Sequence, residues 1–187
     1  MPNWCADQVA FTSNQPNDLS SLFHLKQDLE QALETIQEGD NAWIGRLLRY
    51  KGANPSDIYC RGFVRDFSDK EEIQSNGNFI LSVDSAWEPS FEVYEWIAKT
   101  YDLDYVLIAD EPGSEIFINT DVEGNIFSDR YYVYNDDLDD YYFSSLEEVV
   151  EALNEIDIPA TTEMTLEELN QLDDDIKVYR YKESVDF

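Results

Sequence analysis

The chain has 187 residues, of which 41 are Asp or Glu and 12 are Lys or Arg, so its formal net charge is −29. This charge opposes binding to nucleic-acid phosphates and favours cationic partners. With 43% hydrophobic and 14% aromatic residues, the composition indicates a folded chain rather than a disordered acidic tail. No stretch approaches the roughly 18 apolar residues of a membrane span, and the first residues do not resemble a signal peptide. We therefore expect a cytoplasmic protein without membrane contact.

The first quarter of the chain predicts one strand and two helices. The strand is expected at residues 5–12 and the shorter helix at residues 42–50. The longer helix lies between them and is expected to end near Gly39. Its apolar stripe consists of Leu22, Leu25, Leu29, Leu33 and Ile36.

The next segment predicts two strands and a helix. The strands are expected at residues 60–66 and 78–85. The helix is expected to begin near Pro89 and Ser90 and to end near Tyr101. Its inward residues are expected to be Phe91, Tyr94, Ala98 and Tyr101.

Three further strands are expected at residues 104–110, 115–120 and 126–134. The turn DVEGN is typical of a hairpin that joins the last two. The order strand, helix, strand, strand, helix, strand within residues 5–110 predicts an α+β fold of the ferredoxin-like βαββαβ sandwich type, to which the hairpin would add two strands.

We expect residues 1–134 to form this domain and residues 135–187 to form an acidic C-terminal helical extension packed on it. Two short helices of the extension are expected from S/T-x-x-E capping boxes. The paired residues are Ser145 with Glu148, and Thr165 with Glu168. A final strand is expected at residues 176–183.

Three sequence segments have a more specific pattern. They are MPNWC at the start, DIYCRGFVRDF, and SAWEPSFEVYEWIAKTYDLDYVLIADEPGSEIFI. Together they resemble the YubB-type ferredoxin-like family of plasmid, phage and genomic-island proteins. The resemblance rests on Pro2 to Cys5, Trp87, Pro89 and Glu111 to Gly113, and it implies the sandwich fold and a mobile genetic element, but no chemistry. We expect Trp87 to pack at a sheet end and Gly113 to adopt a positive φ.

The sequence indicates no catalytic, cofactor-binding or metal-binding residues. Counted from Asp121, the sixth and twelfth positions of an EF-hand loop would be Ile126 and Tyr132, which excludes that calcium site. The single histidine, His24, lies in a leucine-rich helical pattern without an adjacent nucleophile, and two cysteines are too few for a structural zinc site. We therefore rank an enzyme third, after the two binding functions described below.

Residues 81–187 contain 29 acidic and five basic residues, a net charge of −24. A compact chain of this length is about 40 Å across, and duplex DNA of that length carries roughly 24 negative charges. This match favours a non-enzymatic nucleic-acid mimic from a mobile element that inhibits a host defence complex of the anti-CRISPR or anti-restriction type. Its partner would be a basic nucleic-acid-binding protein. The second alternative is an acidic accessory or adaptor protein without mimicry.

The expected partner-binding residues combine acidic side chains with one tyrosine. They are Asp136, Asp137, Asp139, Asp140, Tyr141, Glu147, Glu151, Glu155, Glu167, Asp173 and Asp174. Tyr131, Tyr132 and Tyr142 are further candidate anchors, because tyrosine is frequent at interface hot spots. Ordinary strand packing for the tyrosines and a solvated loop for the aspartates remain alternatives. Six basic residues between Arg46 and Lys70 are expected to pair with the acidic half of the chain, residues 81–187, or to form a local docking patch.

Overall fold

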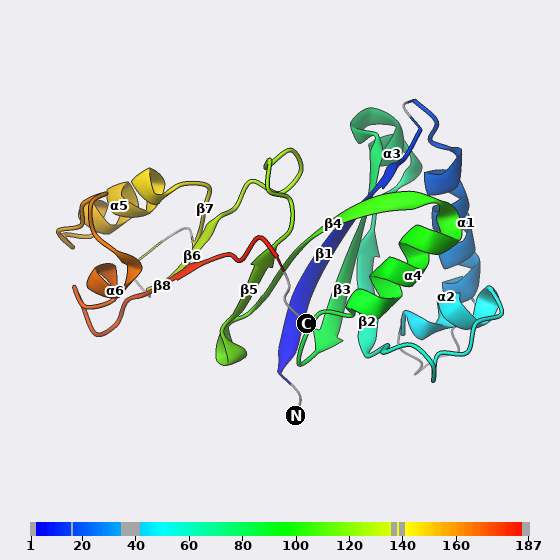
Figure 1. Cartoon of the computed structure of the whole chain (residues 1–187), viewed down its shortest axis with the longest axis horizontal. Helices are drawn as coiled ribbons and strands as arrows, with labels where there is room; N and C mark the ends of the chain where they lie inside the picture. The colour runs from blue at the N-terminus through cyan, green and yellow to red at the C-terminus, as the bar shows by residue number, and fades with distance from the viewer. Residues whose placement is uncertain (1–2, 16, 35–41, 136–137, 139–140, 185–187) are drawn as a thin grey trace. The chain divides into compact units, whose positions relative to one another are not determined.

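Figure 1 shows the computed structural model of the chain. The structure describes residues 3–15, 17–34, 42–135, 138 and 141–184. These residues form six α-helices and an antiparallel sheet of five strands, so the α+β class is confirmed. The chain divides into two compact units, Met1–Ile116 (unit 1) and Phe117–Phe187 (unit 2). The domain boundary expected after Tyr134 falls inside unit 2.

Unit 1 alternates strands and helices. Its elements are β1 (Trp4–Ser13), α1 (Ser20–Glu34), α2 (Gly45–Tyr50), β2 (Gly62–Phe67), α3 (Lys70–Asn76), β3 (Asn78–Ala86), α4 (Phe91–Tyr101), β4 (Leu103–Glu111) and the short 3-10 helix η1 (Pro112–Ser114). The four strands and three of the four α-helices lie where the sequence predicts them. The expected helix end at Gly39 lies outside the described residues. The remaining helix, α3, was not predicted. It begins after Asp69, and the Asp69 carboxylate accepts hydrogen bonds from the backbone N–H of Glu71 and Glu72.

The sheet order is β2-β3-β1-β4-β5, where β5 (Ile116–Asn119) begins at the last residue of unit 1. β1 pairs antiparallel with both β3 and β4, and β2 pairs antiparallel with β3. Figure 1 shows α1 and α4 on the same side of this sheet. Because side chains alternate along a strand, one face of β1 to β4 carries the apolar residues that these helices cover.

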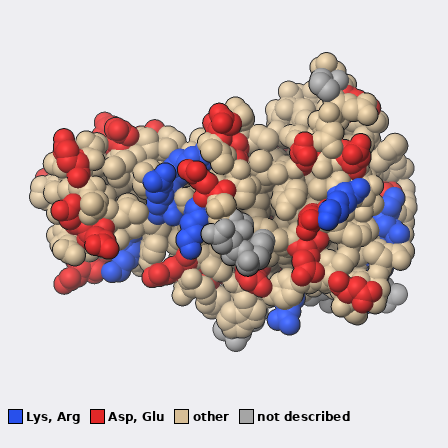
Figure 2. Space-filling view, viewed as in Figure 1, with Lys and Arg blue, Asp and Glu red and all other residues tan. Residues whose placement is uncertain are grey.

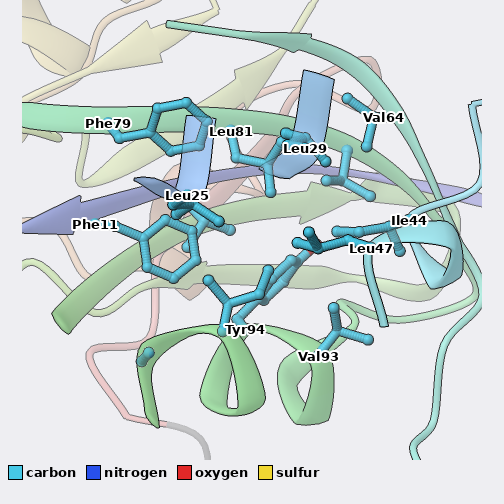
Figure 3. Packing of buried hydrophobic residues seen from close by; sticks show 14 of the residues in the cluster. Phe11, Leu25, Leu29, Ile44, Leu47, Val64, Phe79, Leu81, Val93 and Tyr94 are labelled. Carbon is cyan, nitrogen blue, oxygen red and sulfur yellow. The ribbon is translucent and has the colours of Figure 1, made fainter. Parts of the chain in front are cut away.

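The core of unit 1 lies between this face and the helices (Figure 3). The rings of Phe11 and Phe79, from β1 and β3, have centroids 6.5 Å apart. They belong to the same buried cluster as Leu25 of α1, Leu81 of β3 and Tyr94 of α4. Each buried side chain of this size contributes roughly 1.5–3 kcal/mol to folding. The interior of unit 1 is therefore a continuous apolar layer that fixes the helices on the sheet.

One carboxylate, that of Asp7, is buried in this layer and connects β1, β3 and α4. It accepts hydrogen bonds from Ser85 Oγ at 2.7 Å, from the backbone N–H of Ser90 at 3.3 Å and from the hydroxyl of Tyr94. Ser90 immediately precedes α4, so the negative charge lies at the positive end of the helix dipole. The second oxygen, Oδ1, has no hydrogen-bond partner among the described residues.

Burial raises the pKa of Asp7 to about 6, although the hydrogen bonds from Tyr94 and Ser85 oppose this shift. Burial, followed by the negative charge of Asp7, also raises the pKa of Asp110 in β4 to about 6, while Arg65 opposes it. The pKa of the Cys5 thiol is raised by burial first and then by the charge of Asp7. Unit 1 thus contains a buried anion whose neighbours on β1 and β4 include no compensating cation in direct contact.

We predict that Asp7 makes the protein less stable as the pH rises from about 4 to 6. Over this range an unfolded chain with an ordinary Asp pKa loses its proton while the folded chain keeps it, so the folded state loses its advantage. In Asp7→Asn, the fall in the free energy of unfolding between pH 4.5 and pH 7 should therefore be smaller by about 2 kcal/mol. Urea unfolding at the two pH values measures this difference.

The matched control is Asp104→Asn, which removes the same charge from an exposed position of β4. Its pH dependence should stay close to that of the unsubstituted protein. Equal pH dependence in the Asp7→Asn and Asp104→Asn variants would contradict the assignment to the buried carboxyl group.

Unit 2 has its own sheet and its own core. After the last residues of β5 it contains β6 (Tyr131–Tyr134), β7 (Tyr142–Phe143), α5 (Leu146–Glu155), α6 (Leu166–Leu169) and β8 (Lys177–Arg180). The strand order is β7-β6-β8, and both neighbours are antiparallel to β6. The expected C-terminal extension is therefore not only helical, because β7 and β8 pair with residues 131–134. β8 lies within the strand predicted at residues 176–183, whereas β7 was not predicted.

The predicted hairpin of residues 115–120 and 126–134 is wrong. β5 belongs to the five-stranded sheet, and β6 belongs to the three-stranded sheet. The carboxylate of Asp121 explains why the segment between them does not form a hairpin. It accepts hydrogen bonds from the backbone N–H of Gly124 at 3.2 Å, Ile126 at 2.7 Å and Phe127 at 2.9 Å. These donors are thereby held in a compact loop instead of a strand ladder.

Two more side chains hold the same loop. The Arg130 guanidinium donates to the carbonyl oxygens of Asp121 at 2.6 Å and of Phe127 and Asp129 at 3.0 Å each. The amide of Asn119 donates to the same Phe127 carbonyl at 3.0 Å and to that of Asp129 at 2.7 Å. Burial alone would raise the pKa of Asp121, but the backbone donors outweigh burial and lower it.

We expect Asp121→Ala to lower the free energy of unfolding by about 2 kcal/mol, because several backbone donors lose their acceptor. Glu123→Ala removes the same charge from an exposed position of the same loop and should change stability by less than about 0.5 kcal/mol. Thermal unfolding and urea unfolding of the two variants measure the difference. Equal effects would show that the loop is not held by the Asp121 carboxylate.

Two expectations from the family resemblance are also corrected. Trp87 is 48% exposed and has a φ of 76°, while its backbone N–H donates to the carbonyl of Asn3 at 2.9 Å. Gly113 is not among the residues with positive φ, whereas Glu115 has a φ of 55°. A Cβ atom at Gly113 would lie 2.8 Å from Oε1 of Glu111, so a larger residue would displace the carboxylate that accepts from the Gly113 N–H.

Candidate functional site

The strongest chemical feature of the chain is the separation of charges within unit 2. Unit 2 contains 20 acidic and four basic residues, a net charge of −16. All 46 residues between Arg130 and Lys177, which we call the acidic segment, include 15 acidic residues and no Lys, Arg or His. The acidic segment therefore supplies no cation to neutralise its own carboxylates.

Local hydrogen bonds fix the start of α5. The Ser145 hydroxyl accepts from the backbone N–H of Glu148 at 3.2 Å, as predicted. The Glu148 carboxylate accepts from the backbone N–H of Ser144 at 2.8 Å and from the Ser144 hydroxyl at 2.9 Å. These donors on Ser144 lower the pKa of Glu148. The predicted capping box at α6 is complete, with reciprocal hydrogen bonds between Thr165 and Glu168.

The apolar side of α5 decides where its carboxylates lie. Val149 and Leu153 are buried in the core of unit 2 together with Val133 of β6. The expected row of Glu147, Glu151 and Glu155, spaced by four residues, is exposed on α5. We call α5 and α6 the helix layer of unit 2.

The remaining expected acidic residues are distributed as follows. Glu167 is exposed on α6, and Asp173 and Asp174 are exposed in the segment between α6 and β8. The expected residues Asp136, Asp137, Asp139 and Asp140 lie outside the described residues. Thus the helix layer and the segment that follows it bring together the described acidic members of the predicted set.

Tyr132 and Tyr142 lie on the face of the three-stranded sheet that points away from the helix layer. Val133, Phe143 and Val178 face the helix layer and belong to its core. Because side chains alternate along strands, Tyr132 of β6 and Tyr142 of β7 point away from the helices. Their ring centroids are 5.4 Å apart, and the ring of Tyr141 lies 6.4 Å from that of Tyr132. The structure therefore separates Tyr132 and Tyr142 from the acidic residues of the helix layer, whereas the expected anchor Tyr131 packs against the core of unit 2.

Figure 2 shows Asp and Glu in separate groups rather than as one unbroken acidic surface on the face in view. Lys and Arg side chains are visible between some of these groups.

The basic residues of unit 1 are used locally. Lys51 Nζ lies 2.8 Å from an Asp28 oxygen, and Arg65 lies 3.4 Å from Asp84. The guanidinium of Arg49 lies 4.9 Å from the ring centroid of Trp43. Pairing with the acidic half, one of the roles expected for this cluster, is therefore present for Arg65, whereas Lys51 pairs with a residue of the first half.

A polar pocket near His24 was missed by sequence reasoning. It has a volume of about 360 Å³ and is open to solvent. It is lined by Ser21, His24, Asp28, Lys51, Thr100 and Tyr101.

The chemistry of the His24 pocket is dominated by a pair of contacts to Asp28. Lys51 Nζ and the Tyr101 hydroxyl each donate to the same Asp28 oxygen at 2.8 Å. Burial, followed by the hydrogen bond to Asp28, raises the pKa of Tyr101. Because Asp28 is already occupied by these two donors, the geometry does not indicate a catalytic arrangement of Ser21, His24 and Asp28. The sequence did not reveal this pocket because its lining residues come from α1 and from segments far away in the sequence.

No group of three or more His, Cys, Asp or Glu side chains suited to a metal ion occurs within the part of the chain that the structure describes. Among the same residues, no helix has both the length and the apolar character needed to cross a membrane. Comparisons of the chain with protein-family models, curated proteins and solved structures find no match.

Proposed function

We propose that the protein is a non-enzymatic inhibitor whose helix layer imitates nucleic acid and occupies the cationic groove of a nucleic-acid-binding protein. The observation that carries this proposal is the acidic segment, in which 15 carboxylates occur without a single basic residue. The described acidic residues on α5 and α6 are exposed and accessible to a partner. A cationic groove supplies the positive charge that the segment itself lacks.

The spacing of charges on α5 supports this role. Glu147, Glu151 and Glu155 follow one another at about 6 Å along the helix axis. Like charges at this spacing destabilise a helix by a few tenths of a kcal/mol per pair. Two nucleotide steps of one DNA strand span roughly 6.8 Å of the duplex axis. The row thus has a local cost, and its spacing approximates that of alternate phosphates.

The proposed partner is a restriction or CRISPR nuclease complex, and the proposed setting is a mobile genetic element in the bacterial cytoplasm. The setting comes from the YubB-type resemblance, which we retain as a proposal together with the ferredoxin-like fold. The strand order β2-β3-β1-β4, with antiparallel neighbours, supports that fold. Unit 2 is then an acidic addition to the ferredoxin-like unit.

We predict that the protein blocks DNA binding by such a nuclease complex and that the block weakens as NaCl rises from 50 to 300 mM. Replacing Glu147, Glu151 and Glu155 by Lys should reduce the inhibitory potency at least tenfold, because the row then repels the groove. Filter binding of labelled duplex DNA to the purified nuclease complex, with increasing inhibitor, measures the potency. Circular dichroism of the variant verifies its fold.

The matched control is the triple variant Glu88→Lys, Asp104→Lys and Glu115→Lys. It changes the charge by the same amount at three exposed positions of unit 1. Its potency should stay within about threefold of the unsubstituted protein. Equal losses in both triple variants would favour an acidic adaptor that acts through total charge, and full inhibition by the α5 variant would exclude the helix layer as the binding surface.

A further inference from the structure

The outer face of the three-stranded sheet in unit 2 carries a group of aromatic side chains. We call it the tyrosine face; it consists of Tyr132, Tyr134, Tyr141, Tyr142 and Tyr179, with Phe117 stacked on it. Three of these tyrosines are strongly exposed, with exposed fractions of 48% for Tyr134, 47% for Tyr142 and 36% for Tyr141. Large exposed aromatic side chains from adjacent strands are typical of a contact surface.

Ring contacts hold the centre of the tyrosine face in place. The Phe117 ring stacks on that of Tyr179 with a centroid distance of 4.4 Å and on that of Tyr132 at 5.1 Å. Tyr132 in turn contacts the ring of Tyr142 at 5.4 Å. The exposed ring of Tyr142 therefore rests on a packed aromatic layer, which limits the entropy that it loses on binding.

The charge of unit 2 decides between the ligands that such a face would accept. Aromatic platforms bind the bases of single-stranded nucleic acid, but a net charge of −16 repels the phosphates that accompany every base. The same charge attracts guanidinium groups, which stack on aromatic rings and also bind carboxylates. The chain itself contains this arrangement, since the Arg61 guanidinium lies 5.3 Å from the ring centroid of Tyr59.

We infer that the tyrosine face binds an arginine-rich segment of the partner through cation–π contacts with Tyr134 and Tyr142. This inference rests on the proposed function, because it supplies the chemistry of the cationic partner. The helix layer attracts Arg and Lys alike, whereas the tyrosine face distinguishes them. The two faces therefore divide attraction and selectivity between opposite sides of unit 2.

A single basic residue adjoins the exposed rings in the described part of this face. Lys177 of β8 lies opposite Tyr134 in the strand pairing, so alternation places it beside the tyrosines. Its positive charge opposes an incoming guanidinium. Replacing Lys177 by Glu should therefore increase the affinity for a cationic segment.

The test uses the full chain with two fluorescein-labelled probes, nona-arginine and nona-lysine, and measures affinity by fluorescence anisotropy at 150 mM NaCl. We expect the arginine peptide to bind about tenfold more tightly than the lysine peptide. The double variant Tyr134→Leu and Tyr142→Leu should lose this preference while its affinity for nona-lysine stays the same. Lys177→Glu should strengthen the binding of both probes.

Two control variants keep the test independent of folding. Tyr134→Phe with Tyr142→Phe retains the rings and should retain the arginine preference. Tyr50→Leu removes a tyrosine of unit 1 that is 47% exposed and should leave the preference unchanged.

The outcomes separate this inference from the proposed function. Equal affinities for the two probes, or an arginine preference that survives the leucine variant, would overturn the inference and leave the proposed function standing. Absence of binding to either probe would overturn the proposed function as well, since it requires attraction to a cationic surface.

Discussion

The burial of one side of α5 against the small sheet is the interaction on which the surface of unit 2 depends. Val149 and Leu153 occupy the core beneath the helix, together with Val133 of β6. Once these residues are inside, the helical period places Glu147, Glu151 and Glu155 in solvent. The acidic row is therefore held in a fixed orientation by apolar packing, although its charges repel one another. A partner meets these carboxylates already arranged, which reduces the entropy lost on binding.

A carboxylate of unit 1 is buried, in contrast to the exposed carboxylates of α5. Asp7 is buried and hydrogen-bonded to groups of β3 and α4, where its charge destabilises the folded state at neutral pH. Its position at the start of α4 links the helix to the sheet and gives that junction a defined polar geometry. Acidic residues in this chain thus have two roles. The buried carboxylates of Asp7 in unit 1 and Asp121 in unit 2 order the backbone around them, and the exposed carboxylates determine the charge of unit 2.

Periodic patterns explain which parts of this structure the sequence predicts. The stripe from Leu22 to Leu29 and the alternating residues of β1 and β3 report directly on burial, so these elements were predicted close to their observed bounds. The hairpin prediction failed because DVEGN has the composition of a tight turn, while the side chains of Asn119 and Arg130 donate to carbonyl oxygens at the other end of the loop and hold it compact. No local pattern records such contacts.

The candidate binding surfaces were also only partly predictable from local sequence patterns. The exposure of Glu147, Glu151 and Glu155 follows from helical spacing and was predicted, but the placement of Tyr142 on the opposite face depends on strand pairing with β6. The pocket at His24 depends on contacts between α1 and residues more than 20 positions away, such as Lys51. Site residues that lie on one helix could therefore be grouped from the sequence, whereas those brought together from distant segments could not.

The most direct measurement of the central claim is a nuclear magnetic resonance titration of the full chain with nona-lysine, which carries charge without guanidinium groups. If the helix layer attracts cations, backbone amide shift changes will concentrate at residues 146–155 and 166–175, and they will disappear at high salt. Shift changes of equal size along α1 and α4 of unit 1 would contradict this claim, because they would show that cations are attracted to the whole molecule rather than to the helix layer.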